Sequence, residues 1–349
     1  MPRVTIAPVA ATLMAVLVSG TSAAAPAPAL DQTMPSVAFN SHPSVRNFLV
    51  VWVEDRGARP DLYAKRLFEN GLPQGGPTKN GWQVIRDTST VDRGAPPPRP
   101  RSDPSLIYNP TREEFLLTFA EDTGEVDGWD IFSVRISSAG FSSGKPRLVA
   151  GGPGDQRRPD TALVEGDEYF VVWDDNARDR DEIWARRLQA NSIPRGSAYR
   201  LVAEPQWNAS DPTTNGSVVA WVDDRLVQTD IWAQRLKNGI INGEEYLVAR
   251  EVEDEFAPRY GSGGLLWNIY NTASGLDIVG AQVYENDRTR GKTGILVPAA
   301  DQAWPDAENG IVVFADDRAG ELNVYGIRIT GNIRVRGREF PIFTDYALP

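Results

Sequence analysis

The sequence has 349 residues, no cysteine, a single histidine (His42) and a formal net charge of −11 at pH 7. Without cysteine no disulfide can form, and one histidine excludes a multi-histidine zinc site and argues against a Ser-His-Asp catalytic triad. The negative charge also argues against nucleic acid and anionic membrane surfaces as partners, because their phosphate groups would repel it.

The chain begins with the pattern of an export signal. Arg3 precedes an apolar run at residues 5–18, which is followed by small residues at 19–25. A basic start, a short apolar segment and a small-residue exit are typical of a cleaved signal peptide, which we predict at residues 1–25. The apolar run is shorter than the ~20 residues that cross a bilayer, and no second one follows. We therefore expect a secreted monomer, extracellular or periplasmic, that does not insert into a membrane.

The rest of the chain is predicted to be a short lead-in at residues 26–34 and a single domain at residues 35–349, built from six copies of one repeat. Each copy begins at a proline, and these prolines are Pro35, Pro104, Pro159, Pro212, Pro258 and Pro305. An apolar strand follows and ends in an aromatic residue: Trp52, Phe119, Trp173, Trp221, Trp267 or Phe314. A period of roughly 50 residues with only strand-like content is typical of propeller blades. The predicted fold class is all-β, a six-bladed β-propeller with four antiparallel strands per blade.

In chain order, each repeat predicts an inner strand at its proline, the apolar second strand, a third strand and a weaker outer strand. The third strands are predicted at residues 62–66, 131–135, 183–187, 231–235, 278–282 and 324–328. The proline-rich residues 88–103 are predicted to be an insertion between the first two blades. The last residues, 345–349, repeat the pattern of residues 31–35, so the chain stops where a seventh repeat would begin. We therefore predict residues 340–343 as the outer strand of blade six, with most blades formed from contiguous sequence.

This order of strands resembles the TolB-like six-bladed propellers over roughly residues 31–349. The Ser-Pro-Asp-Gly turn of that family is reduced here to fragments such as Pro159-Asp160 and Pro305-Asp306, and the Asp-box of sialidases is missing. The resemblance implies the propeller fold and leaves the chemistry open, because one fold serves many functions.

Five of the six third strands end in an arginine: Arg66, Arg135, Arg187, Arg235 and Arg328. The two-residue period of a strand places each on the same face as apolar neighbours, where a buried guanidinium needs a carboxylate partner. The predicted partners are the acids that follow the aromatic residue of the second strand: Asp55, Asp122, Asp224 and Asp317. We expect these pairs to be structural salt bridges.

An acid stands four residues before the repeat proline in four of the six units: Asp31, Asp155, Asp254 and Asp301. Two interpretations are open. Each side chain could form an Asx-turn that caps its own inner strand. Alternatively, the four carboxylates could form a ring at the channel mouth that binds a hard cation such as Ca²⁺, which prefers oxygen ligands.

Two tryptophans, Trp207 and Trp304, lie in the connections that lead into inner strands, and Asn208 occupies the acid position of blade four. Aromatic residues in such loops are favoured for recognition, although they could also pack on a neighbouring blade. We take Trp207, Asn208 and Trp304 as candidate ligand-binding residues.

No catalytic motif stands out, and three functions compete. The first is a non-catalytic binding or scaffold protein that uses the loop face for a glycan, peptide or protein partner. The second is a hydrolase or lyase that acts on a polysaccharide through paired carboxylates at the channel mouth. The third is a structural module of an exported assembly. Two unpaired carboxylates in one deep pocket would favour the enzyme.

Overall fold

The computed structural model describes residues 31–55, 59–75, 81–85, 99–124, 128–178, 180–202, 206–226, 228–271, 275–284, 288–294 and 301–343. The predicted signal peptide, most of the predicted insertion at 88–103 and the C-terminal pattern at 345–349 lie outside these residues. In the part of the chain that is described, no helix is long and apolar enough to cross a membrane.

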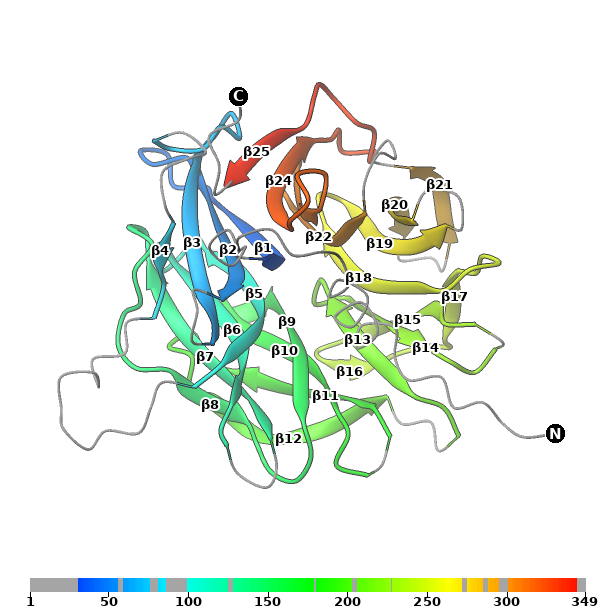
Figure 1. Ribbon diagram of the computed structural model, residues 1–349. Helices are drawn as coiled ribbons and strands as arrows, with labels where there is room; N and C mark the ends of the chain where they lie inside the picture. Colours follow the sequence, from blue (N-terminus) through cyan, green and yellow to red (C-terminus); the bar gives the residue numbers. More distant parts are fainter. Residues whose placement is uncertain are drawn as a thin grey trace, which may run out of the picture.

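Six antiparallel sheets surround a central axis, which confirms the predicted six-bladed β-propeller (Figure 1). Blades one to three contain β1 (Gln32–Asn40), β2 (Asn47–Asp55), β3 (Pro60–Phe68), β4 (Trp82–Gln83), β5 (Arg101–Asn109), β6 (Glu114–Asp122), β7 (Trp129–Ser137), β8 (Arg147–Ala150), β9 (Gln156–Val164), β10 (Glu168–Asp175), β11 (Glu182–Leu188) and β12 (Pro194–Val202). Blades four to six contain β13 (Ala209–Thr214), β14 (Val218–Asp223), β15 (Asp230–Lys237), β16 (Ile240–Ile241), β17 (Tyr246–Ala249), β18 (Glu255–Gly261), β19 (Gly264–Asn271), β20 (Gly275–Tyr284), β21 (Arg288–Gly294), β22 (Gln302–Glu308), β23 (Ile311–Asp316), β24 (Asn323–Arg328) and β25 (Phe340–Phe343).

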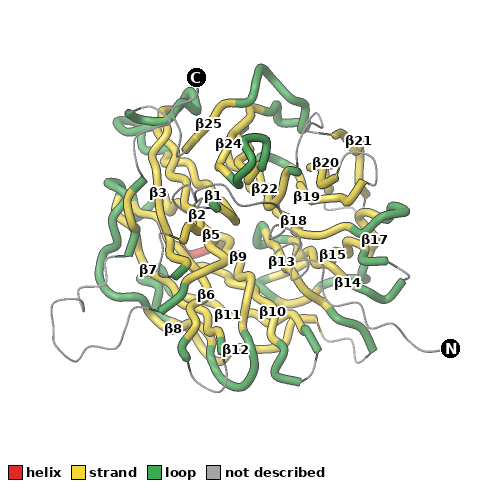
Figure 2. The backbone as a smooth tube through the Cα atoms, viewed as in Figure 1, coloured by secondary structure: helices red, strands yellow, loops and turns green. Residues whose placement is uncertain are grey.

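Each blade has four strands except blade four, where the short β16 and β17 both pair with β15. Figure 2 shows strands joined by loops, with a short helical turn at Glu165–Asp167. β25 is the outer strand of blade six and pairs with β24, as predicted. Every blade is therefore contiguous in sequence, so contacts between side chains and loops must join blade six to blade one. Across this junction the rings of Trp52 and Phe343 stack with centroids 5.4 Å apart.

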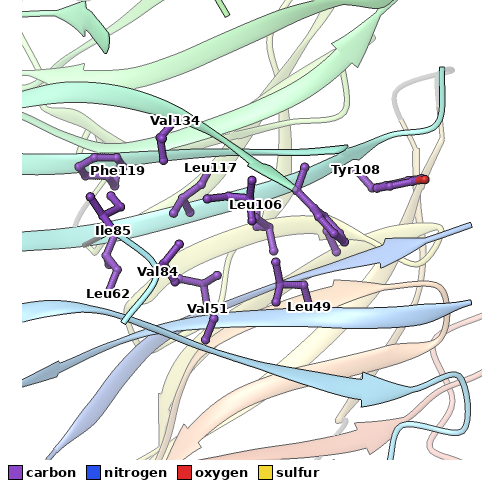
Figure 3. Close-up of a cluster of buried hydrophobic side chains, with 14 of the residues drawn as sticks. Leu49, Val51, Leu62, Val84, Ile85, Leu106, Tyr108, Leu117, Phe119 and Val134 are labelled. Atoms are coloured by element: carbon purple, nitrogen blue, oxygen red, sulfur yellow. The ribbon is translucent and has the colours of Figure 1, made fainter. Parts of the chain in front are cut away.

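The hydrophobic core consists of six clusters, and each cluster lies between two neighbouring blades. Figure 3 shows the cluster between blades one and two, where Leu49 and Val51 of β2 face Leu106 of β5 and Leu117 of β6. The second strand of each blade is buried on both faces, which explains its continuous apolar run. Each fully buried side chain of this kind contributes about 1.5–3 kcal/mol, so the interfaces between blades provide most of the stability.

Every inner strand carries a bulge directly before its proline. The third residue of each inner strand has left-handed backbone geometry with φ between 48° and 52°; these residues are Met34, Asp103, Arg158, Asp211, Ala257 and Trp304. The pairing of each inner strand with its second strand shifts register at this point. The inner strands therefore begin three residues before the proline and not at the proline itself.

A left-handed residue other than glycine costs roughly 1–2 kcal/mol. Because this strain recurs at six equivalent positions, we expect the side chains of these residues to have a role that offsets it.

A second ring of side chains follows the prolines and ties the inner strands together. Asp160 of blade three accepts hydrogen bonds from Ser105 Oγ of blade two (2.9 Å) and from Thr213 Oγ1 of blade four (2.7 Å). Asp306 of blade six accepts one from Ser36 Oγ of blade one (2.7 Å), which adds a polar contact across the closing junction.

Candidate functional site

A cavity of about 570 Å³ lies at the end of the channel where the inner strands begin, and all six bulge residues line it. We call it the channel-mouth pocket. Its size falls within the ~300–1,000 Å³ typical of sites for small ligands. The bulges explain its lining, because a bulge redirects the side chain of a strand. A larger cavity of about 1030 Å³ occupies the opposite end of the channel. There the carboxylates of Asp160 and Asp306 are already used in holding the blades together.

The six bulge residues divide the channel-mouth pocket into two halves. Blades two, three and four contribute the charged residues Asp103, Arg158 and Asp211. Blades five, six and one contribute Ala257, Trp304 and Met34. Phe256 of blade five adds to the second half. The pocket therefore presents a mostly apolar wall, to which Arg259 of blade five adds one guanidinium, opposite a charged wall. This arrangement suits a ligand with one apolar and one polar side.

The charged wall centres on Arg158. Its Nε donates to Asp174 Oδ2 at 2.6 Å and lies 2.9 Å from Asp211 Oδ1, and its Nη2 lies 3.9 Å from Asp181 Oδ2. We call these four residues the Arg158 cluster. Three carboxylates thus share one guanidinium, so the cluster carries an excess of negative charge when all three are ionised.

Burial and mutual repulsion alter the ionisation of this cluster. Burial raises the pKa of Asp174 to about 7, although Arg158 acts in the opposite direction. Burial also raises the pKa of Asp181, and Asp211 adds to that effect. The side chain of Asp174 is only 1% exposed, and its Oδ1 is fully buried and has no hydrogen-bond partner among the residues that the structure describes. This oxygen belongs to a residue that lines the pocket.

A second arginine is neutralised separately. Arg157 Nε donates to Asp103 Oδ2 at 2.8 Å, and the guanidinium lies 4.2 Å from the ring centroid of Trp129. Burial of Asp103 opposes its charge, but Arg157 holds the pKa of this carboxyl below its usual range. Arg157 and Asp103 therefore form a balanced pair, which leaves the excess charge at the Arg158 cluster.

Asp174 marks a departure from the repeat. It pairs with Arg157, the residue directly before the bulge residue. The equivalent positions in the other blades are Val53, Ala120, Val222, Asn268 and Ala315. An acid at a position that is apolar in four other blades is the kind of singular feature that a site requires. Asp174 and five of the six bulge residues, all but Trp304, were not among the predicted site residues, although an acid directly after Trp173 was a visible signal.

The structure separates the three predicted ligand-binding residues. Trp304 lines the channel-mouth pocket, and its backbone N–H donates to Asn268 Oδ1 at 3.0 Å. Trp207 and Asn208 are not among the residues that line it. The Arg225 guanidinium lies 5.1 Å from the Trp207 ring, and Asn208 Nδ2 donates to Asp224 at 2.7 Å. Both residues therefore contact the hairpin of their own blade.

The four predicted metal ligands lie at separate blade junctions. Each accepts a hydrogen bond from a backbone N–H at the start of the third strand of the preceding blade. Asp31 accepts from Leu322 (3.3 Å), Asp155 from Trp129 (3.1 Å), Asp254 from Thr229 (3.0 Å) and Asp301 from Leu276 (2.9 Å). The Asx-turn interpretation is therefore wrong about the donor, which belongs to the neighbouring blade.

Of the four predicted metal ligands, Asp155 lines the channel-mouth pocket. In the described part of the chain, no three acidic or histidine side chains gather closely enough to hold a metal ion. The Ca²⁺ ring stays a prediction.

The predicted arginine pairs are wrong for Arg135 and Arg187. Arg187 pairs with Glu168 at 3.0 Å and Arg135 with Glu114 at 3.1 Å, both at the beginning of the second strand. Antiparallel pairing places the end of the third strand beside the start of the second, far from the acids that follow the aromatic residue. Asp122, one of the predicted partners, accepts instead from the backbone of Gly124 in its own turn.

Comparisons with known proteins give distant structural matches and no family. No family model and no curated protein matches the chain. Among solved structures, TolB from Acinetobacter baumannii is 11% identical with a TM-score of 0.49, and the match covers 88% of this chain and 64% of that chain. An arabinanase of Bacillus subtilis is 12% identical with a TM-score of 0.44, over 84% of this chain and 92% of that one. A prolyl endopeptidase is 12% identical with a TM-score of 0.45; the match covers 88% of this chain and 42% of the endopeptidase. The chain is a six-bladed β-propeller with distant structural relatives of several kinds.

Proposed function

We propose that this protein is an exported, non-catalytic binding protein that holds a saccharide unit of a glycan in the channel-mouth pocket. One observation carries the proposal: six strained bulges direct side chains into one cavity, with apolar residues on one half and charged residues on the other. Strain repeated at every blade is retained when the redirected side chains serve a purpose.

The composition of the two walls favours a saccharide. A pyranose ring has apolar C–H faces that pack on an aromatic ring such as that of Trp304, which lines the pocket. Its hydroxyl groups suit the carboxylates and the guanidinium of the charged wall, because hydrogen bonds to ionised groups are the stronger ones. The volume of about 570 Å³ accommodates one or two sugar units.

The test compares two tryptophan variants by calorimetric titration with oligosaccharides selected on a glycan array. Trp304→Ala removes the aromatic ring on which the sugar would pack, and we expect binding to weaken about tenfold or more, a change of about 1.4 kcal/mol. Trp207→Ala is the matched control, because Trp207 also precedes an inner strand but is not among the lining residues. Absence of any bound glycan, or equal weakening by both variants, would contradict the proposal.

One observation favours the polysaccharide hydrolase as a second candidate. Asp174, with its pKa raised to about 7, and Asp211 both lie at Arg158, so a protonated carboxyl and a carboxylate share one pocket. General acid and base catalysis of glycoside hydrolysis uses such a pair. The test is whether the protein releases reducing ends from the bound glycan. If it does, and if Asp174→Asn abolishes the release, the protein is a hydrolase and not a non-catalytic binding protein.

A further inference from the structure

We infer that the bound saccharide is an acidic sugar whose carboxylate pairs with the guanidinium of Arg259 in the channel-mouth pocket. This inference rests on the proposed glycan binding and names the class of sugar. It begins from the place of Arg259, which lines the pocket from blade five, on the same half as the aromatic residues Phe256 and Trp304.

Arg259 departs from the repeat at the position directly after the proline. The residues at this position are Ser36, Ser105, Asp160, Thr213, Arg259 and Asp306. Four of them accept a hydrogen bond from a backbone N–H of the next blade: Ser36 from Leu106 (3.0 Å), Asp160 from Thr214 (2.8 Å), Thr213 from Tyr260 (2.9 Å) and Asp306 from Val37 (2.8 Å). A guanidinium has no acceptor atom, so Arg259 cannot make this contact. The equivalent N–H of blade six, that of Ala307, bonds to Asp306 instead.

The positive charge of Arg259 has no ion-pair partner among the residues that the structure describes. Its Nη1 donates to the backbone carbonyl of Pro258 at 2.8 Å. Burial raises the pKa of Asp306 and the charge of Arg259 opposes that rise, but the carboxylate of Asp306 already accepts from Ser36 and Val37. The bond to Pro258 leaves the Nε and Nη2 edge of the guanidinium for a ligand. Two N–H groups on one edge match the two oxygens of a carboxylate.

The carboxylates of the charged wall limit the charge that the ligand can carry. In a ring of six blades, blade five lies across the channel from blade two, whose Asp103 is paired with Arg157. On the adjoining blade four, Asp211 Oδ1 lies 2.9 Å from Arg158 Nε. Arginines therefore offset both carboxylates in part, but the wall would still repel a dianion such as a phosphate ester more strongly than a single negative charge.

The two walls together would orient an acidic sugar. Its carboxylate would pair with Arg259, and the apolar face of its ring would pack on Trp304, which lines the same half of the pocket. Its hydroxyl groups would then donate to the carboxylates of blades two to four, which accept such hydrogen bonds strongly.

The experiment begins with a glycan array that presents uronic acids, their methyl esters and the neutral parent sugars of the gluco, galacto and manno series. The uronic acid that binds best is then titrated calorimetrically into the full chain, together with its ester and its neutral parent. The methyl ester keeps the shape of the carboxylate but loses its charge. We expect the acid to bind about tenfold or more tightly than the ester, because the ester cannot form a bidentate ion pair. Added salt should reduce this difference, since it screens the pair.

The decisive variant is Arg259→Gln, which removes the positive charge but keeps a side chain that donates hydrogen bonds. We expect this variant to bind the acid no more tightly than the ester, while its affinity for the ester and the neutral sugar is unchanged. Arg259→Lys keeps the charge without the planar guanidinium and should recover part of the preference. Arg334→Gln is the matched control, since it removes an exposed arginine from the connection between β24 and β25.

Each outcome bears on a different claim. If the ester and the neutral sugar bind as tightly as the acid, or if Arg334→Gln loses the preference equally, the inference fails and glycan binding survives. If no saccharide binds, glycan binding fails with it. If a sulfate ester of the neutral sugar binds more tightly than the uronic acid, the assignment to a carboxylate is overturned.

Discussion

The interfaces between blades and the channel mouth use the same sixfold repeat in opposite ways. At the interfaces, equivalent positions hold similar residues: Trp52, Phe119, Trp173, Trp221, Trp267 and Phe314 are all buried. At the mouth, the backbone repeats closely but the six bulge residues comprise two acids, an arginine, a methionine, an alanine and a tryptophan. The comparison teaches that the scaffold follows from what the blades share, whereas specificity arises where one blade departs from the others.

The largest effect should come from the interface at which the ring closes. Trp52 is fully buried and stacks on Phe343 of blade six, so Trp52→Ala leaves a cavity across the junction that no covalent connection supports. We expect a loss of about 3–5 kcal/mol in the free energy of unfolding, measured by denaturant titration. A loss below about 1 kcal/mol would mean that the side chains do not hold the ring closed.

The next effect concerns the charged wall and is read from pH. Burial raises the pKa of Asp174 from 3.8 to about 7, so the folded state binds this proton more tightly than the unfolded state. The resulting stabilisation is complete below about pH 4 and is lost as the pH rises through about 7. The wild type should therefore lose on the order of 2–4 kcal/mol more than Asp174→Asn between these limits. Asp306, with its pKa raised to about 6, contributes equally to both proteins. Parallel curves of melting temperature against pH would show that Asp174 titrates normally.

A smaller effect tests the hydrogen bonds at the blade junctions. Asp301→Ala removes the acceptor for the backbone N–H of Leu276, and we expect a loss of about 1–2 kcal/mol. Asp301→Asn keeps an acceptor and should cost less. Both variants should melt identically with Ca²⁺ and with EDTA. If Ca²⁺ raises the melting temperature of the wild type but not that of Asp301→Ala, the cation ring is supported instead.

The smallest effect compares a bulge residue with a residue in the regular part of an inner strand. Ala257 has φ near 50°, so Ala257→Gly relieves left-handed strain, and we expect the stability to rise by about 0.5 kcal/mol. Ala162 lies in the regular part of β9, where the same substitution should cost about 1 kcal/mol or more. Equal losses at both positions would show that the bulges carry no strain.

The fold could be predicted because its signals are local and repeated. Each second strand is buried on both faces, which gives a continuous apolar run, and the period counts the blades. The outer strand of blade six was confirmed for the same reason. The arginine partners could not be predicted by adjacency alone, because the antiparallel register moves Arg187 to the opposite end of the strand, beside Glu168.

Less of the candidate site could be predicted, because tertiary pairing creates it. Nothing in the local preferences of Met34 or Trp304 favours left-handed geometry; the strand register imposes it. Asp174 resembles the acids that follow the other aromatic residues, and only the pairing with Arg157 shows that it occupies an apolar position of the repeat. Trp304, one of the candidate ligand-binding residues, lines the channel-mouth pocket because its connection leads directly into an inner strand.

The most direct test of the account is a crystal structure of the protein soaked with an oligosaccharide selected on the glycan array. We predict one sugar ring in the channel-mouth pocket, with its face against Trp304 and its hydroxyl groups within hydrogen-bond distance of the charged wall. The six left-handed residues should keep their geometry around it. An oligosaccharide bound outside the pocket, or inner strands that lack the six bulges, would contradict the claim that the six bulge residues form the ligand site.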